Sequence, residues 1–556
     1  MAFRVNYVRQ AQDPDPRLNV WNASQLQNIS IQSGTPGDSY TLLYNGTNNE
    51  WQYSPGQTQL QTLTGNNQDI QTLDGSVTIL RPTTYYSTYN LANPSMTQTK
   101  TIILEGDASC NIVTNHGTLN LDSNNTSAEL LYDANVNRWI RYDVNSNTFS
   151  WFVSQLQQEI NGGNGAQPVV MSSNATVLIE STPLIVYGVV SYQTTGAISF
   201  YMYTGGLWQP SGIQSVCIGT GAVGNANQGY SVAMTSTASD IVSGGPLDNG
   251  GVGAVWVFSP TTMPPNSDPL LTTLVQQGGK LTPSDNVGNS NFGWSVAISA
   301  DGSTMAIGGP LDDTEVGATW IFVKNAGVWS QQAKLIGTGA IGPFAARQGW
   351  SVALSGDGNV LATGGPLDDS VVGAVWIFTR NGAVWTQQTK LVGTDSISTP
   401  NQGWSVSLSS GGNTLAVGGP NDSFVPGPPI GAVWIFTNDG TGNWVQEQKI
   451  VGTGYSLTFP VQQGWSVSLS SDGHTLAIGG PGDSFGGSVW IFTRNFSWNT
   501  TQYVWTQQYN NGNPKLSISP SVVDNFGWSV SLGGQTGNNL VVGTQDTGLQ
   551  RLYTFV

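Results

Sequence analysis

Short apolar runs separated by Gly-, Asn- and Asp-rich turns recur along the C-terminal two thirds of the chain. Each repeat opens with Gly, an aromatic residue, Ser and Val, and then continues through a tight turn such as Asp301-Gly302 into a second apolar run. The aromatic residue recurs at steps of 54 to 64 residues, at Tyr230, Trp294, Trp350, Trp404, Trp465 and Trp528. Self-similarity at such a period indicates a repeat architecture.

Two further apolar runs complete each repeat. The third run reads Gly-Ala-Val-Trp-Ile-Phe or a relative, and it begins at Gly253, Gly317, Gly373, Gly431 and Gly487, with weaker copies at Gly196 and Gly548. The fourth run reads Trp-x-Gln-Gln-x-Lys-Leu, clearest at Trp329–Leu335. Four short strands joined by turns are the content of one propeller blade. The sequence therefore predicts an all-β protein with a seven-bladed β-propeller of four-stranded blades over residues 151–556.

The two ends of the repeat array predict how the ring closes. The last repeat stops at Val556, just after its third strand, and would leave an unpaired edge. We expect the segment before the first repeat, Phe149–Gln155, to supply the missing outer strand.

Residues 1–150 contain a weaker duplication and predict a small β-rich domain. Ser39–Tyr53 aligns with Ser127–Tyr142, offset by 88 residues, and both copies read as a β-hairpin anchored by Trp51 or Trp139. This pattern resembles the small β-modules of bacteriophage tail fibres and giant-virus surface fibres. The resemblance implies an anchoring or assembly domain whose partners are capsid or fibre proteins.

The repeats themselves resemble FG-GAP repeats, the family that builds the propeller of integrin α-subunits. The likeness is plainest at Phe292–Val296 and Ile307–Pro310. It implies a propeller used for adhesion or protein interaction. Calcium-binding members carry several alternating acidic residues in a hairpin loop, whereas the turn here holds one Asp followed by Gly. No cofactor is therefore expected, and a calcium site lacks a full ligand set.

Composition narrows the classes of partner. Charged residues make up 9% of the chain and the net charge is −16, so a phosphate backbone would be repelled and nucleic-acid binding is not expected. The two cysteines, Cys110 and Cys217, exclude a disulfide framework. No apolar run approaches the ~20 residues that span a bilayer, and none near Met1 suggests a secretory signal. We expect a protein made in the host cytoplasm without membrane insertion.

Acidic residues between the second and third strands are the main candidate binding residues. Equivalent loops of a propeller lie on one face, so their carboxylates could form a ring that binds cations or a basic partner. The alternative is that each Asp caps its own turn, which is the commoner role. The set comprises Asp248, Asp312, Asp313, Asp368, Asp369, Asp422, Asp483 and Asp546.

Tryptophan and lysine recur at fixed repeat positions. Residues repeated in every blade usually pack the blades together, so Trp498, which breaks the pattern, is the better candidate for a surface contact. Five lysines share one position on the fourth strand, and we interpret them as protection of an outer edge against aggregation. They are Lys280, Lys334, Lys390, Lys449 and Lys515.

Catalysis is not expected from this sequence. The Ser-x-Asp-Gly turns resemble the Asp boxes of sialidase propellers, but those enzymes need several converging arginines. Arg380 and Arg494 share a position on an outer hairpin and cannot converge on the axis. His474 is the propeller's only histidine, and no nucleophile–base pair is visible.

The sequence favours a non-enzymatic virion surface or fibre protein whose propeller presents a site for a host glycan or protein. A cellular or bacterial adhesin or interaction platform of the integrin-propeller type is the alternative, and a propeller glycosidase is a third. Two insertions, Phe424–Ile430 and Asn495–Tyr503, lengthen regular connections. Binding surfaces of repeat proteins often lie in such insertions, so we expect them to contribute to binding.

Overall fold

The computed structural model divides the chain into two units between Ser150 and Trp151. In the N-terminal unit it describes strands only. From residue 151 it describes 158–161, 169–172, 177–182, 196–204, 207–210 and 216–554 except 261–273, 343–344, 424–426, 485, 498–501, 510–512, 518–524, 535–536 and 546–548.

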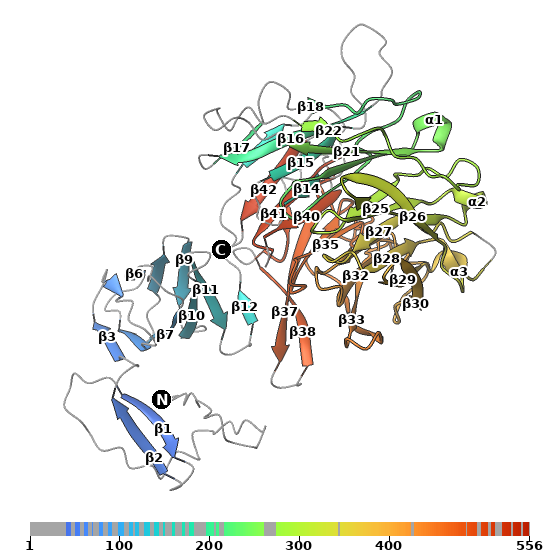
Figure 1. Ribbon diagram of the computed structural model, residues 1–556. Coiled ribbons are helices and arrows are strands. Elements are labelled where there is room, and N and C mark those ends of the chain that lie inside the picture. Colours follow the sequence, from blue (N-terminus) through green and yellow to red (C-terminus); the bar gives the residue numbers. More distant parts are fainter. Residues whose placement is uncertain are drawn as a thin grey trace. The chain divides into compact units, whose positions relative to one another are not determined.

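The second unit consists of seven antiparallel sheets arranged as a propeller (Figure 1). Their innermost strands contact one another in a closed circle, in the order β14, β19, β23, β27, β31, β35, β40 and back to β14. Each sheet has four main strands; in six sheets these follow chain order from the centre outward, and two sheets gain a short extra strand. The predicted repeat propeller is thus confirmed in its all-β content and in its four-stranded antiparallel sheets.

The seven blades have the following strands. Blade 1 contains β14 (Val169–Met171), β15 (Val177–Thr182), β16 (Ala197–Thr204), β17 (Leu207–Pro210) and the short β18 (Val216–Cys217). Blade 2 contains β19 (Ser231–Met234), β20 (Ile241–Gly245), β21 (Ala254–Pro260) and β22 (Leu274–Gln276). Blade 3 contains β23 (Ser295–Ile298), β24 (Thr304–Gly309), β25 (Ala318–Asn325) and β26 (Val328–Leu335). Blade 4 contains β27 (Ser351–Leu354), β28 (Val360–Gly365), β29 (Ala374–Asn381) and β30 (Val384–Leu391). Blade 5 contains β31 (Ser405–Leu408), β32 (Thr414–Gly419), β33 (Ala432–Asn438) and β34 (Trp444–Ile450). Blade 6 contains β35 (Ser466–Leu469), β36 (Thr475–Gly480), β37 (Ser488–Ser497), β38 (Gln502–Gln507) and the short β39 (Leu516–Ser517). Blade 7 contains β40 (Ser529–Gly533), β41 (Asn539–Gly543), β42 (Leu549–Thr554) and β13 (Gln158–Asn161).

Blade 7 joins the two ends of the array, but with a different strand from the one expected. Its outer strand is β13, which pairs with β42 from Gln158 opposite Leu552 to Asn161 opposite Leu549. The predicted segment, Phe149–Gln155, lies too early in the chain. Phe149 belongs to β12 (Thr148–Ser150) and pairs with Tyr142 in the N-terminal unit, so the chain closes the ring only after leaving that hairpin.

Burial along the strands explains their sequences. In blade 4 the first five residues of β29, Ala-Val-Trp-Ile-Phe, are all buried, because this middle strand is covered on both faces by neighbouring blades. The outer strand β30 alternates exposed and half-buried positions instead. A strand that is buried on both faces requires a continuous apolar run, and a strand that is buried on one face requires an alternating run. Clusters that join residues of adjacent blades form the core.

The N-terminal unit combines hairpins with parallel strands. Both predicted hairpins are present, and Tyr44 opposite Trp51 corresponds to Tyr132 opposite Trp139. From Leu60 to Thr114 the strands alternate between two sheets, and neighbouring strands within each of these sheets are parallel, which is the connectivity of a short β-helix. The strands are β1 (Tyr40–Asn45), β2 (Glu50–Pro55), β3 (Leu60–Thr64), β4 (Asp69–Ile70), β5 (Val77–Arg81), β6 (Ser87–Leu91), β7 (Gln98–Leu104), β8 (Cys110–Thr114), β9 (Gly117–Leu121), β10 (Ser127–Asp133) and β11 (Arg138–Asp143), followed by β12.

Candidate functional site

The Gly-aromatic-Ser-Val signal is a joint between neighbouring blades. The hydroxyl of Ser351 in blade 4 donates to the carbonyl oxygen of Gly403 in blade 5 at 2.8 Å. The same bond joins blades 2 to 3, 3 to 4, 5 to 6 and 6 to 7 at 2.8–2.9 Å. A glycine of the second strand permits this close approach, because a Cβ on Gly364 would lie 2.2 Å from the Gly403 carbonyl oxygen.

The aromatic residue of the same signal forms a collar around the propeller axis. Successive ring centroids lie 4.6–4.9 Å apart with interplanar angles of 45–49°. Rings repeated about a sevenfold axis at this spacing have centroids about 5–6 Å from the axis. We call this set the aromatic collar: Tyr230, Trp294, Trp350, Trp404, Trp465 and Trp528. The equivalent position in blade 1 is Gln167 by sequence, and it lies outside the described residues.

All six collar residues are partly exposed, whereas the third-strand tryptophans are fully buried. Burial raises the pKa of the Tyr230 hydroxyl above its ordinary value, so this residue stays neutral in the collar. The fully buried set comprises Trp256, Trp320, Trp376, Trp434 and Trp490. Packing therefore accounts for the third-strand set, while the collar offers aromatic surface at the axis.

In blades 2 to 6, the acidic residue that opens the second-to-third-strand loop is buried in an ion pair. In blade 4, Asp368 is fully buried; its Oδ2 lies 2.5 Å from Nζ of Lys390, and its Oδ1 accepts from the backbone N–H of Ile341 at 2.8 Å. Lys390 Nζ also lies 5.4 Å from the centroid of Trp376. The equivalent ion pairs are Asp248–Lys280, Asp312–Lys334, Asp422–Lys449 and Asp483–Lys515.

These ion pairs correct the interpretation of the five lysines. They do not protect a strand edge, because each ammonium group turns inward to the carboxylate of its own blade. Each Asp also holds the segment through which the chain enters that blade, so it joins the blade's beginning to its end. Removing one partner of such a pair typically costs about 3–5 kcal/mol.

The predicted acidic ring divides into buried and exposed members. Asp248, Asp312, Asp368, Asp422 and Asp483 are the buried, paired residues described above, whereas Asp313 and Asp369 are exposed. Asp546 and Trp498 lie outside the described residues. The role of the exposed carboxylates in binding stays a prediction.

The exposed carboxylates lie on strained left-handed turns. In blade 3, Asp313, Thr314 and Glu315 have φ angles of 46°, 55° and 72°, and Asp369, Ser370 and Val371 of blade 4 have 47°, 56° and 78°. Left-handed backbone is costly for side chains branched at Cβ. These turns form the short segments α2 (Asp312–Glu315) and α3 (Asp368–Val371), and α1 (Asp248–Gly251) is their counterpart in blade 2. The buried Asp immediately before each strained stretch anchors it.

These turns and the segments between blades share one face, which we call the loop face. The hydrogen bond from Ile341 N–H to Asp368 places the two kinds of loop side by side. Exposed aliphatic side chains recur there at equivalent positions, at Val223, Val287 and Ile341. Exposed carboxylates lie on the same loops, and one of them, Glu315, is paired with the guanidinium of Arg347 at 2.6 Å. The exposed acidic residues are Asp285, Asp313, Glu315, Asp369 and Asp395.

The opposite face carries the first turns and the outer hairpins of the blades, and we call it the turn face. Consecutive first turns are linked by backbone hydrogen bonds, for example from Ala300 N–H to Gly356 oxygen at 2.9 Å and from Gly356 N–H to Ser410 oxygen at 2.8 Å. In the Asp-Gly turns a carboxylate accepts local donors. Partial burial acts to raise the pKa of Asp301, but hydrogen bonds from Ser299 and Ser303 outweigh it and lower that pKa.

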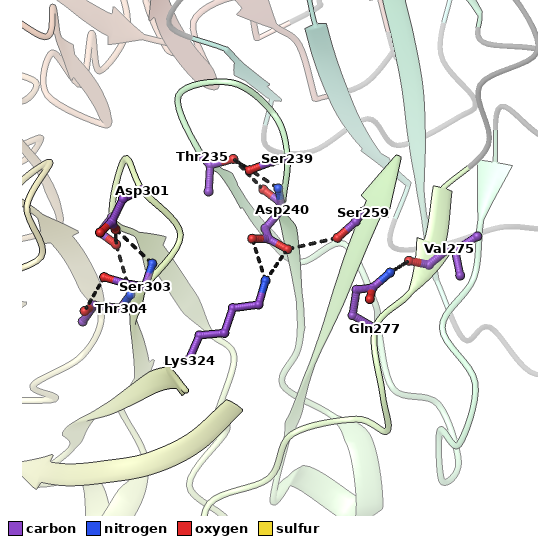
Figure 2. A network of polar contacts seen from close by, with 11 residues as sticks. Thr235, Ser239, Asp240, Ser259, Val275, Gln277, Asp301, Ser303, Thr304 and Lys324 are labelled. Carbon is purple, nitrogen blue, oxygen red and sulfur yellow. Dashed lines mark hydrogen bonds and ion pairs between the residues drawn. The ribbon is translucent and has the colours of Figure 1, made fainter. Parts of the chain in front are cut away.

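Figure 2 shows an ion pair that joins blades 2 and 3 on the turn face. Lys324, at the outer hairpin of blade 3, lies 2.9 Å from both carboxylate oxygens of the buried Asp240, which also accepts a hydrogen bond from Ser259 at 3.0 Å. Asp240 of blade 2 is equivalent in the repeat to Thr304 of blade 3. The ion pair is therefore specific to the contact between blades 2 and 3. It stabilises the ring and leaves no charge for a ligand.

Comparisons with known proteins support the repeat family locally. The family model described as FG-GAP repeat matches residues 275–322, which run from the outer strand of blade 2 through the third strand of blade 3. A search of curated proteins found no similar sequence. The match and the repeated four-stranded sheets together indicate a propeller-type interaction or adhesion module. Within the described part of the chain, no helix has the length and apolar character to cross a bilayer.

Proposed function

We propose that this protein is a non-enzymatic binding module that docks a partner on its loop face. The aromatic collar carries the proposal. Six partly exposed rings, held against one another from blade to blade around the axis, provide rigid apolar surface. Aromatic residues are enriched at the centres of protein interfaces because they offer large area at low conformational cost.

The surroundings of the collar favour a basic partner. The exposed aliphatic residues Val223, Val287 and Ile341 extend the apolar surface outward, and the exposed carboxylates on the same face carry negative charge. Complementary charge at the rim of an interface steers association and selects partners. A partner surface with apolar and Lys- or Arg-rich character therefore fits best.

The innermost strands argue for binding rather than catalysis. Strands β19, β23, β27, β31, β35 and β40 contain Ser, Val, Ala, Met, Ile, Leu and Gly, with no titratable side chain. A propeller glycosidase would need carboxylates near the axis. No cluster of three or more His, Cys, Asp or Glu suited to a metal occurs among the residues described.

The wider setting that we propose is a virion surface. Residues 1–150 would anchor the chain to a capsid or fibre, and the propeller would face the host. The paired hairpins with matching Tyr–Trp registers and the low-charge, Gly-rich composition support this setting. A cellular or bacterial adhesin with the same loop-face chemistry is the alternative, and locating the chain by antibody labelling of purified particles distinguishes the two.

A matched pair of photo-crosslinking variants tests the docking face. A photoreactive amino acid replaces Ile341 on the loop face in one full-length protein and Val384 on the turn face in the other; these residues are 57% and 67% exposed, respectively. Illumination on intact host cells or particles should give a discrete adduct only from position 341. Adducts from position 384 alone, or equal labelling from both, would contradict the proposal.

A further inference from the structure

The residues that break the repeat pattern gather at the outer hairpin of blade 6. Strands β37 and β38 continue to Ser497 opposite Gln502, beyond the length of the equivalent hairpins, and this hairpin projects from the ring in Figure 1. Tyr503 is the position equivalent to Ala383 of blade 4. His474 takes the turn position that is Asn359 in blade 4, and Glu447 of blade 5 replaces a glutamine, Gln332 of blade 3.

These departures form one connected cluster on the turn face. The guanidinium of Arg494 donates to both carboxylate oxygens of Glu447, from Nε at 2.8 Å and from Nη2 at 2.5 Å. Trp505 Nε1 donates to the same carboxylate at 3.0 Å. Arg494 Cζ lies 4.2 Å from the ring centroid of Tyr503, and the His474 ring lies 6.1 Å from it at an angle of 54°.

The blade 4 counterpart lacks such a platform. There Arg380 Nε donates to Asn359 at 3.0 Å, its guanidinium lies 5.4 Å from the Trp385 ring, and Trp385 donates to Gln332 at 3.1 Å. The structural bonds between neighbouring blades are thus kept in both places. The added feature of blade 6 is an aromatic ring that remains 44% exposed.

The cluster fixes Tyr503 without needing a ligand. Arg494 is itself held by two charge-assisted bonds, so the ring stacked on it is preorganised, and preorganisation lowers the cost of binding. One polar group lies beside the ring, the His474 imidazole. The exposed carboxylate of Asp472 belongs to the same turn as His474 and accepts from the His474 backbone N–H at 3.0 Å.

We propose that Tyr503, together with His474 and the turn that carries Asp472, binds a neutral pyranose sugar. An exposed, fixed aromatic ring offers a face for the C–H side of a sugar ring, and the imidazole and carboxylate offer partners for its hydroxyl groups. The guanidinium of Arg494 is already paired with Glu447, so the described residues of this cluster offer no unpaired guanidinium or ammonium group to an anionic sugar, a sulfate or a phosphate. This site lies on the turn face and is independent of the proposed loop-face docking.

A glycan array probed with the labelled full-length chain tests this site. The array includes galactose-, glucose-, mannose- and N-acetylhexosamine-terminated oligosaccharides together with sialylated and sulfated ones, and calorimetry measures affinity for the glycans retained. We expect retention of a neutral class. Tyr503→Ala should weaken it about tenfold, the equivalent of 1.4 kcal/mol, whereas Tyr503→Phe should bind within about twofold because it keeps the ring.

The matched control is Val384→Ala, an exposed residue on the corresponding hairpin of blade 4, which should bind like the unchanged chain. Thermal unfolding of each variant verifies that the hairpin change leaves the ring folded. The site is refuted by any of three results: no neutral glycan is retained, Tyr503→Ala binds as well as the unchanged chain, or only acidic glycans are retained. None of these results bears on crosslinking from position 341.

Discussion

Blade 4 and blade 6 contain the same structural bonds but differ at their outer hairpins. Both have a buried Asp–Lys pair, Asp368–Lys390 and Asp483–Lys515, and both pass a serine hydroxyl bond to the following blade. Blade 4 ends in a short hairpin with small and aliphatic residues, whereas blade 6 carries the Arg494–Tyr503 stack. The difference indicates that the residues shared by the blades stabilise the ring. The residues that differ in a single blade can then form a binding site without weakening the ring.

The largest expected effect comes from breaking the buried ion pair, and it should be shared by both blades. Asp368→Ala leaves the Lys390 ammonium without its carboxylate and should lower the free energy of unfolding by about 3–5 kcal/mol. Asp483→Ala should cost at least as much, because Asp483 also accepts a bond from Ser488 at 2.6 Å. Denaturant unfolding measures both changes.

Two controls show whether the ion pair itself is responsible. Asp369→Asn alters the charge of the exposed neighbour, keeps a residue type that tolerates the left-handed backbone, and should change stability by no more than about 0.5 kcal/mol. The double variant Asp368→Ala/Lys390→Met removes the unpaired charge and should recover part of the loss. If Asp368→Ala were as mild as Asp369→Asn, the ion pairs would not be the bonds that maintain the blades.

A smaller loss is expected where a glycine packs against the buried tryptophan. A Cβ on Gly337 would lie 2.2 Å from Cδ1 of Trp376, and one on Gly452 would lie 2.3 Å from Trp490. Gly337→Ala and Gly452→Ala should each cost about 1–3 kcal/mol by overpacking. Gly279→Ala, where nothing lies within 4 Å, is the control and should be close to neutral in thermal unfolding. Equal melting temperatures for all three would contradict the packing account.

The serine joints should have a still smaller effect. Ser351→Ala and Ser466→Ala each remove one hydrogen bond to the next blade and should cost about 1 kcal/mol. Ser529 holds the same position in blade 7, but its buried hydroxyl has no hydrogen-bond partner among the described residues. Ser529→Ala should therefore be neutral or slightly stabilising. A loss at Ser529 as large as at Ser351 would show that the joint is not the cause.

Periodicity was enough to predict the blades because every strand repeats its burial pattern. Gly-Ala-Val-Trp-Ile-Phe is typical of a strand covered on both faces. Because the motif or a relative occurs once in each blade, the number of copies gives the number of blades. The predicted position of the ring-closing strand was wrong by a few residues. The sequence of β13 has no repeat signature, and the sequence does not reveal that Phe149 pairs with Tyr142.

The Asp–Lys pairs could have been found in the sequence but were missed. Asp368 and Lys390 occur at fixed positions in the same units, and this shared occurrence was the available signal. Their roles were assigned separately, because spacing along the chain does not show that the end of a fourth strand lies beneath the preceding loop. The collar was also missed, since ring-to-ring distances between blades depend on the radius of the circle. The Tyr503 cluster was anticipated only as an insertion.

The smallest effect concerns pH and contrasts blade 4 with a blade that lacks the turn carboxylate. Partial burial acts to raise the pKa of Asp357, but hydrogen bonds from Ser355 and from the backbone and side chain of Asn359 outweigh it and lower that pKa. A carboxyl group whose pKa is lower in the folded than in the unfolded state stabilises the protein when the pH lies above its unfolded-state pKa of about 3.9. That contribution is lost as the pH falls through the folded-state pKa.

Asp357→Asn keeps the acceptor oxygen and removes the charge. The melting-temperature difference between the unchanged chain and this variant should therefore be fully present at pH 6 and smaller at pH 3, below the unfolded value. In blade 5 the equivalent turn has Gly411, so Gly411→Ala should shift the melting temperature equally at both pH values. A difference for Asp357→Asn that is constant across this range would mean that the turn's hydrogen bonds do not favour the ionised carboxylate.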